Sequence, residues 1–98
     1  MNIQALMRQA QNLQKDMMKA KEEIDNMTFI GKSSIVSVTV KGNKTITKVE
    51  INGDISNDDK EMIEDMLVVA INDAFKQIDS VTEQKMGKFS SMMPGGLF

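Results

Sequence analysis

The sequence predicts an α+β fold in the order helix, three antiparallel strands, helix, and three observations support it. Apolar residues recur at steps of three and four before residue 28 and again after residue 58, which is the period of a helix packed on one side. Between these segments, apolar and polar residues alternate as they do in strands. Gly42-Asn43 interrupts the alternation with a tight turn. A chain of 98 residues has the size of one domain.

The first helix should carry a heptad seam. Its apolar positions alternate steps of three and four without a miss: Ile3, Leu6, Ala10, Leu13, Met17, Ala20, Ile24 and Met27. A helix of roughly 25 residues is about 37 Å long, more than a domain of this size needs, so part of it should project or pair. We therefore predict a dimer or packing seam formed by Ile3, Leu6, Leu13, Met17 and Ile24.

The middle segment predicts a hairpin. Valine occupies every second position over residues 36–40, and residues 45–51 repeat the alternation. A two-residue turn with glycine in first place puts Val40 opposite Thr45 and Val36 opposite Val49, which gives a consistent inner face. Residues 28–30 are the expected short first strand, separated from the hairpin by Gly31-Lys32-Ser33.

The second helix is expected to begin near Asp58, with Glu61 three residues later as the partner in a capping box. Acidic residues gather in its first turns, where they offset the helix macrodipole at about 0.3–1 kcal/mol each. Its broad apolar face comprises Ile63, Met66, Leu67, Ala70, Ala74, Ile78 and Val81. We place its end at about Met86 or Lys88, the single domain at residues 1–89, and a flexible tail at residues 90–98.

The residue inventory excludes most enzyme classes. The chain has no cysteine and no histidine, so it has no thiolate or imidazole metal ligand and no Cys-His or Ser-His-Asp arrangement. A calcium loop starting at Asn52 fails, because Asn57 replaces the required glycine and Ile63 replaces the final glutamate. There is no glycine-rich phosphate loop. We expect a protein that is not an enzyme, with no metal, no cofactor and no small-molecule substrate.

Charge is segregated along the chain. The net charge of −2 argues, taken whole, against a nucleic-acid partner. Residues 1–21, however, contain four cations and a single acid, Asp16. Residues 26–49 contain four lysines and no acid. Residues 50–65 hold seven acids against Lys60. Clustered cations are what phosphate contact requires, so an acidic chain of this kind can still bind DNA.

Two groups of cations are candidate DNA contacts. Arg8, Lys15 and Lys19 lie opposite the heptad seam, on a stripe that has no acid before Glu22. Lys41 and Lys44 flank the turn and, in a two-residue hairpin, sit directly opposite each other, which disfavours folding. An ordinary solvated helix face is the alternative for the first group, and a solvated turn with splayed lysines is the alternative for the second. Ten methionines are either core and interface filler or an adaptable binding surface.

Several short segments of the sequence resemble the bacterial YbaB/EbfC family of nucleoid-associated proteins. They are Leu6-Met7-Arg8-Gln9-Ala10-Gln11, Val49-Glu50-Ile51, Asp58-Asp59-Lys60-Glu61-Met62-Ile63-Glu64-Asp65, Ala70-Ile71-Asn72-Asp73-Ala74 and Glu83-Gln84-Lys85-Met86. The resemblance covers essentially the whole chain. It implies a homodimer with a tweezer-like outline that binds DNA through basic helix residues. By position, Arg8, Lys15 and Lys19 would face DNA, with Lys76, Lys85 and Lys88 as further candidates.

Two functions remain to be separated. The first is a DNA-binding homodimer with a role in nucleoid organisation and gene regulation. The alternative is a protein-interaction module that grips a partner helix through the first-helix seam or the methionine-rich surface. No stretch approaches the length of a membrane span and the N-terminus does not resemble a signal peptide, so we expect a cytoplasmic, nucleoid-associated protein without a membrane partner.

Overall fold

The predicted order of elements is confirmed in the computed structural model, which describes the backbone of residues 2–92 and the side chains of residues 2–89. Helix α1 (Ile3–Asp25) is followed by strands β1 (Thr28–Ser33), β2 (Val36–Lys41) and β3 (Ile46–Ile51). A short 3-10 turn, η1 (Asn57–Asp59), leads into the long helix α2 (Lys60–Met92). The three strands form one antiparallel sheet in the order β1-β2-β3.

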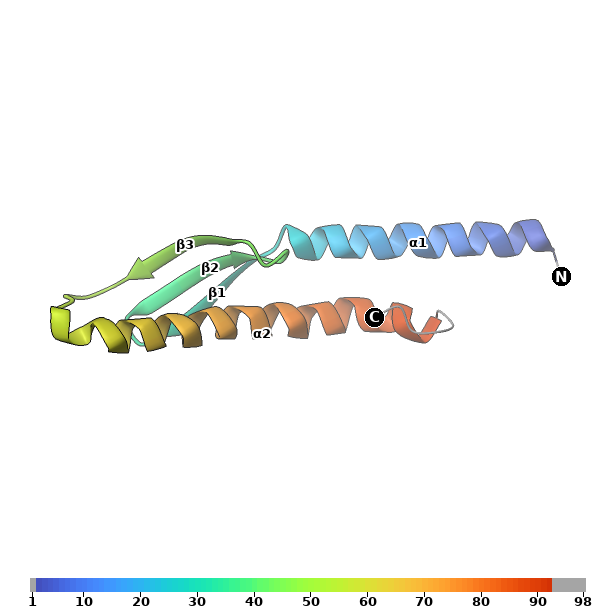
Figure 1. Cartoon of the computed structure of the whole chain (residues 1–98). Coiled ribbons are helices and arrows are strands. Elements are labelled where there is room, and N and C mark those ends of the chain that lie inside the picture. The colour runs from blue at the N-terminus through green and yellow to red at the C-terminus, as the bar shows by residue number, and fades with distance from the viewer. Residues whose placement is uncertain (1, 93–98) are drawn as a thin grey trace.

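The molecule is long and thin. Its extents are 70 × 21 × 14 Å and its radius of gyration is 19.4 Å, whereas a compact chain of this length has a radius of about 13 Å. The sheet lies over the first half of α2, while α1 runs alongside the second half and extends past it (Figure 1). The helical pair is therefore an arm that projects from a sheet-containing body.

The core lies between the sheet and α2. Val36, Val38 and Val40 of β2 are fully buried and pack with Ala70, Ala74 and Ile78 of α2. The predicted inner face of β2 and the predicted apolar face of α2 are both confirmed, since every member of that α2 face is buried or half-buried. At about 1.5–3 kcal/mol for each fully buried large aliphatic side chain, this layer is the main stabilising contact of the body.

Strand β1 is longer than predicted, because Gly31 does not end it. A Cβ at Gly31 would lie 1.9 Å from the carbonyl oxygen of Ala70, so glycine allows the strand to run directly against α2. Two α2 side chains also bind the outer edge of β1: Asp73 accepts a hydrogen bond from the Lys32 amide at 3.0 Å, and Gln77 donates one to the Ile30 carbonyl at 2.9 Å. The Gly31-Lys32-Ser33 segment is therefore strand and not a linker.

The predicted register of the hairpin is wrong. Val36 pairs with Ile51 and Val38 with Val49, and a bulge lies between Thr39 and Val40. The Lys41 amide donates to the Thr45 carbonyl, so the connection has three residues and not two. Lys44 has a φ of 66° and takes the left-handed position, whereas Gly42 does not. Glycine at this position instead allows the turn to pack closely against the end of α1, since a Cβ at Gly42 would lie 1.7 Å from the carbonyl oxygen of Ile24.

Both predicted ends of α2 also differ from the observed ones. The N-terminal cap is formed by Ser56 and Asp59, whose carboxylate accepts hydrogen bonds from the Ser56 amide at 3.3 Å and hydroxyl at 3.1 Å, and not by Asp58 with Glu61. At the other end α2 continues to Met92, so residues 90–92 of the predicted tail are helical. Burial of Phe89 against α1 favours the added turn. Residues 93–98 of the predicted tail lie outside the described residues.

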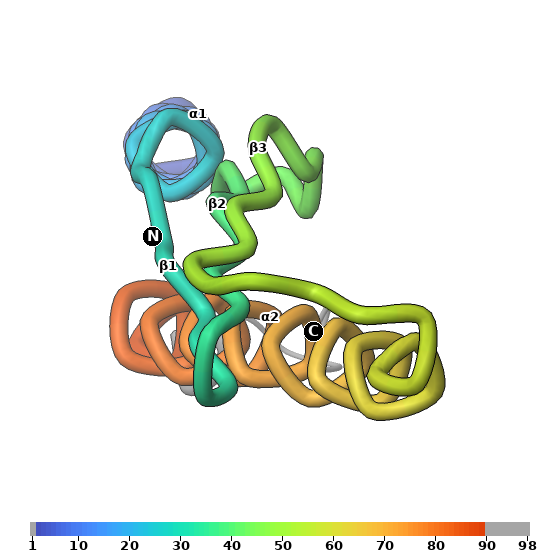
Figure 2. Tube along the Cα trace, turned by 90° about the vertical axis from the view of Figure 1, so that its left-hand side faces the viewer, coloured from blue at the N-terminus to red at the C-terminus, as the bar shows by residue number. Residues whose placement is uncertain are grey.

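Strand β3 is the least covered part of the sheet. The sheet contacts of α2 are with β1 and β2, and Figure 2 shows β3 as the strand farthest from α2. All six residues of β3 are exposed, including Ile46 at 42%, Val49 at 47% and Ile51 at 36%. The predicted inner face therefore continues onto β3, but nothing in the described chain covers it there.

Candidate nucleic-acid interface

The outer face of α1 brings together three of the predicted DNA contacts. Arg8, Lys15 and Lys19 are separated by seven and four residues, so at 100° per residue they fall within about 40° of arc on the helix. All three side chains are exposed, and they span about 16 Å along the axis. We refer to Arg8, Lys15 and Lys19 as the α1 ridge.

The lower half of the heptad seam holds the ridge in place. Leu13, Met17 and Ala20 are half-buried and pack against a cluster formed by Ile24, Met86 and Phe89. These seam positions lie on the side of α1 opposite the ridge, so packing against α2 turns the cations outward. At the start of the helix, the Asn2 side chain accepts a hydrogen bond from the Gln4 amide at 3.0 Å and caps the first turn.

The upper half of the seam has no cover from the described chain. Ile3 is 71% exposed and Leu6 is 43% exposed, because this part of α1 runs beyond α2 (Figure 1). The predicted seam is thus divided: Leu13, Met17 and Ile24 serve packing within the chain, whereas Ile3 and Leu6 face outward.

The electrostatics separate the ridge from most of the other candidate cations. Among residues 2–92, none of the three ridge cations forms an ion pair. In contrast, Lys44 lies 3.2 Å from Asp79, Lys85 lies 3.9 Å from Glu23, and the Lys88 ammonium lies 5.0 Å from the centre of the Phe89 ring. The ridge therefore presents charge that a phosphate can neutralise without first displacing a carboxylate of the described chain.

The turn cations do not form the facing pair expected from the sequence. Lys41 pairs with Thr45 across the hairpin, and Lys44 leans over α2, where its ammonium also lies 5.6 Å from the Phe75 ring centre. The left-handed conformation of Lys44 therefore avoids the electrostatic repulsion that a facing Lys41-Lys44 pair would have. Lys41, like Lys76 on α2, is exposed.

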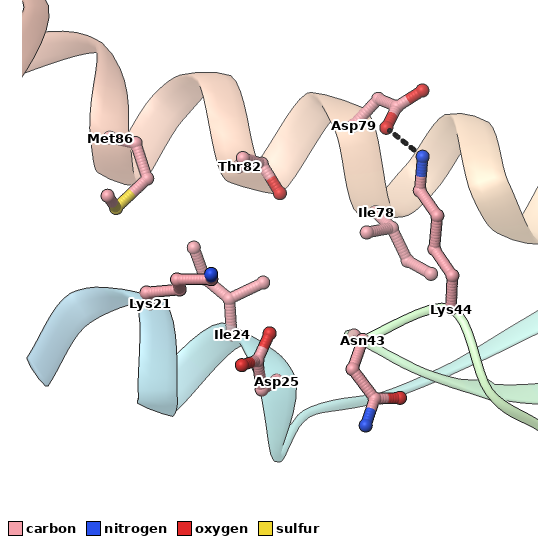
Figure 3. A pocket seen from close by; sticks show the side chains of 10 residues that line it. Lys21, Ile24, Asp25, Asn43, Lys44, Ile78, Asp79, Thr82 and Met86 are labelled. Carbon is pink, nitrogen blue, oxygen red and sulfur yellow. Dashed lines mark ion pairs between the residues drawn. The ribbon is translucent and has the colours of Figure 1, made fainter. Parts of the chain in front are cut away.

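Lys44 also lines a half-open pocket of about 600 Å³ between the end of α1, the turn after β2 and the middle of α2 (Figure 3). Its floor is apolar, with Ile24, Ile78 and Met86. Charges of both signs line the rim of the pocket, and two of them, Lys44 and Asp79, form an ion pair with each other. The pocket lacks the unbroken positive lining that a phosphate chain requires.

Phe89 is the structural residue that the sequence analysis missed. It is 3% exposed and anchors the arm by packing on Ile24. The signal was present, since Ile78, Met86 and Phe89 follow one another at helical spacing on one face. The predicted helix end at about residues 86–88 placed Phe89 outside the helix and hid it.

Residues 2–92 contain no group of three or more acidic side chains arranged to hold a metal ion. Within the same part of the chain, no helix combines the length and the apolar character needed to cross a bilayer.

Comparison with known proteins agrees with this arrangement. The model of the YbaB/EbfC DNA-binding family matches residues 1–93. A nucleoid-associated protein of Lactococcus lactis subsp. cremoris (strain MG1363) is 47% identical over 97 residues, covering 96% of this chain and 98% of the relative. One of Streptococcus pneumoniae (strain Hungary19A-6) is 41% identical with the same coverage.

The fold itself has a solved counterpart. The crystal structure of uncharacterized protein HP0035 from Helicobacter pylori matches with a TM-score of 0.72 at 23% identity, covering 95% of this chain and 99% of that one. The family match over residues 1–93 and the 47% identity to the Lactococcus relative show that the chain belongs to the YbaB/EbfC DNA-binding family.

Proposed function

We propose that this protein binds duplex DNA with little sequence preference, as a nucleoid-associated protein, and that the α1 ridge makes the principal phosphate contacts. The observation that carries the proposal is the ridge itself: Arg8, Lys15 and Lys19 share one exposed face of a projecting helix and, among residues 2–92, have no carboxylate partner. The names of the relatives from Lactococcus and Streptococcus support the nucleoid role.

The physical basis is the release of counterions. Each Lys or Arg that neutralises a phosphate frees condensed cations, so affinity for duplex DNA falls with salt at a slope of about −0.9 per contact. An α-helix also fits the major groove of DNA. There, the Gln and Asn side chains beside the α1 ridge can form hydrogen bonds with the DNA backbone or with base edges. The phosphate contacts position a protein on DNA without specifying a sequence.

We further propose that the protein acts as a homodimer, which doubles the ridge. The uncovered apolar residues of β3 and of the first turns of α1 support self-association, because a monomer would leave these side chains in water. Two ridges engaging about six to eight phosphates give an expected slope of log affinity against log salt of about −5 to −7. Sedimentation at micromolar concentration should show a dimer, and a monomer alone would remove this part of the proposal.

The test is a fluorescence-anisotropy titration of duplex DNA over a series of salt concentrations. Arg8→Glu/Lys15→Glu/Lys19→Glu should abolish binding, and the double variant Lys15→Glu/Lys19→Glu should weaken it by at least about 10²-fold at low salt. A matched double reversal, Lys32→Glu/Lys60→Glu, changes the net charge by the same amount on exposed positions away from the ridge and should weaken binding far less. Equal losses in the two double variants, or a flat salt slope, would contradict the ridge.

One observation supports the second candidate function, a protein-interaction module. The exposure of Ile3 and Leu6 fits a protein-interaction module that holds a partner helix along the start of α1. Leu13 and Met17 no longer belong to that surface, since they pack on the cluster of Ile24, Met86 and Phe89. If this function holds, Leu6→Ser should abolish capture of the partner helix, whereas the triple reversal of Arg8, Lys15 and Lys19 should leave capture intact.

A further inference from the structure

The first turns of α1 project as a single helix. Every residue of α1 before Leu13 is exposed, and Leu13 is the first to pack against the cluster of Ile24, Met86 and Phe89. We refer to residues 3–12 as the α1 tip, and Figure 1 shows this end of α1 running past α2. An α-helix with its side chains is about 10–12 Å across, whereas a helical pair is nearly twice as wide. The tip is therefore the narrow end of the arm.

The tip carries amide, apolar and cationic side chains but no acid, since the first acidic residue of the chain is Asp16. Along one flank of the α1 ridge lie Gln4, Gln11 and Met7, all of them exposed, with Met7 at 58%. At 100° per residue, the two glutamines lie about 40° and 60° around the helix from Met7, and the ridge begins at about 80°. A strip of apolar and amide groups thus borders the cations.

The packing of the chain does not account for this strip. Within residues 2–89, neither glutamine side chain has a hydrogen-bond partner. In the same part of the chain, Met7 belongs to neither apolar cluster. The strip is therefore available to a ligand that offers both hydrogen-bonding groups and small apolar groups.

The major groove at A·T base pairs has this chemistry. The groove is about 12 Å wide and admits one helix, whereas the minor groove is about 6 Å wide and does not. In the major groove, adenine presents the N7 acceptor beside the N6 donor, which a glutamine amide can bind together. Thymine presents its C5 methyl group, which an apolar side chain can contact, and G·C pairs present no methyl group. A tip without acids also avoids repulsion from the phosphates on both sides of the groove.

We propose that the α1 tip enters the major groove and favours A·T base pairs, with Met7 against thymine methyl groups and Gln4 and Gln11 on adenine edges. This inference rests on the proposed DNA binding and names the residues that sense base composition. Lys15 and Lys19 lie on the wider, paired part of the arm and contact phosphates outside the groove. Methionine is unbranched and has three rotatable bonds, so it can follow methyl groups at different positions. The result is a preference for A·T-rich duplexes without one fixed site.

Uracil-substituted DNA tests the methyl contact. Two duplexes of the same A·T-rich sequence, one with uracil in place of every thymine, differ only in the C5 methyl groups. In anisotropy titrations, the wild-type protein should bind the uracil duplex about fourfold more weakly for each methyl group that the tip covers. The slope of log affinity against log salt should be the same for both duplexes, because loss of a methyl group releases no counterion.

Variants assign the effect to the tip. Met7→Ala should bind the two duplexes equally, because alanine is too short to reach the methyl group, and alanine is favourable in a helix. Met62→Ala is the matched control, since Met62 is 48% exposed near the start of α2 and far from the tip. It should keep the full wild-type discrimination. Comparing the ratio of the two affinities between variants cancels any effect of uracil on the shape of the duplex.

The adenine contacts are tested in the same way. Replacement of adenine by 7-deazaadenine removes the N7 acceptor and leaves the base pair intact. Gln4→Ala/Gln11→Ala should bind the ordinary A·T-rich duplex about fivefold or more weakly than wild type does. On the 7-deazaadenine duplex the double variant and wild type should bind alike. A double variant that binds the ordinary duplex as tightly as wild type would remove both glutamines from the proposal.

The outcomes separate this inference from the proposed function. Discrimination that is lost in Met7→Ala and kept in Met62→Ala supports the inference. A wild-type protein that binds thymine and uracil duplexes equally, with a steep salt slope, overturns it and leaves the α1 ridge standing. Discrimination that persists unchanged in Met7→Ala also overturns it, because the methyl groups then act without the tip. A flat salt slope contradicts the ridge and removes both proposals.

Discussion

At the scale of single residues, two glycines place the elements that carry the candidate site. Neither Gly31 nor Gly42 has a positive φ, so backbone freedom does not explain them. Both sit where another backbone passes too close for a Cβ: Gly31 against Ala70 of α2, and Gly42 against Ile24 at the end of α1. Gly42 therefore joins the sheet to the arm that bears the ridge.

Gly42→Ala should lower the free energy of unfolding by about 1–3 kcal/mol or more, because the added Cβ meets a backbone carbonyl that cannot rotate away. Gly87→Ala is the matched control. Gly87 lies within α2, and a Cβ added there would meet no atom within 4 Å beyond its own turn of the helix, so the substitution should raise stability by about 0.5–1 kcal/mol. Urea unfolding of both variants measures the difference. A Gly42→Ala protein as stable as wild type would show that the contact with Ile24 relaxes at no cost.

The same turn shows what a single residue can hide from sequence analysis. Gly42-Asn43 predicts a two-residue turn, yet the Asn43 side chain accepts a hydrogen bond from the Thr45 amide at 3.1 Å and Lys44 takes the left-handed conformation. Lysine is an uncommon residue for that conformation, so its position could not be anticipated from residue preferences. The contact of Gly42 with α1 is a tertiary feature, invisible in the local sequence.

At the scale of elements, periodicity predicted more than turn chemistry did. The valines of β2 and the apolar face of α2 follow from spacing and are confirmed, because burial of one face enforces one period. On α1 the same spacing places Leu13, Met17 and Ile24 in contact with α2, whereas Ile3 and Leu6 remain exposed. The pairing of β2 with β3 depends on the length of the turn and on a bulge, and both follow from contacts made elsewhere. The outward face of the ridge was predictable for the same reason as the seam, since the two lie on opposite sides of one helix.

The attachment of the arm is the element-scale feature most open to a mutational test. Phe89→Ala removes the side chain that packs on Ile24 and Met86, with a typical cost of about 3–5 kcal/mol for a buried phenylalanine. Because this cluster is separate from the core under the sheet, the loss should loosen α1 first. Hydrogen exchange should therefore quicken in α1 while β2 stays protected.

The control for Phe89→Ala is Val68→Ala, which truncates an exposed side chain of the same helix and should change stability by no more than about 0.5 kcal/mol. Uniformly faster exchange in β2 and α1 would contradict the prediction. It would show that arm and body unfold as one unit.

At the scale of the whole molecule, charge and shape act together. The cationic start of α1 and the acidic start of α2 lie at opposite ends of a particle 70 Å long (Figure 1). That distance is many times the screening length of about 8 Å at physiological ionic strength, so the acidic end does not cancel the field around the ridge. The net charge of −2 is therefore a poor guide to what the arm binds.

Dimerisation provides the last prediction. If the protein is the homodimer proposed above and each copy carries one ridge, a sample dilute enough to be monomeric should make half of the phosphate contacts without any change in α1. The salt slope should then fall from about −5 to −7 in the dimer to near −3, the value for the three cations of one ridge. Anisotropy titrations above and below the concentration at which the dimer dissociates, with sedimentation of each sample, measure both quantities at once. A slope that stays near −3 in a sample shown to be dimeric would mean that the two ridges do not engage one duplex together.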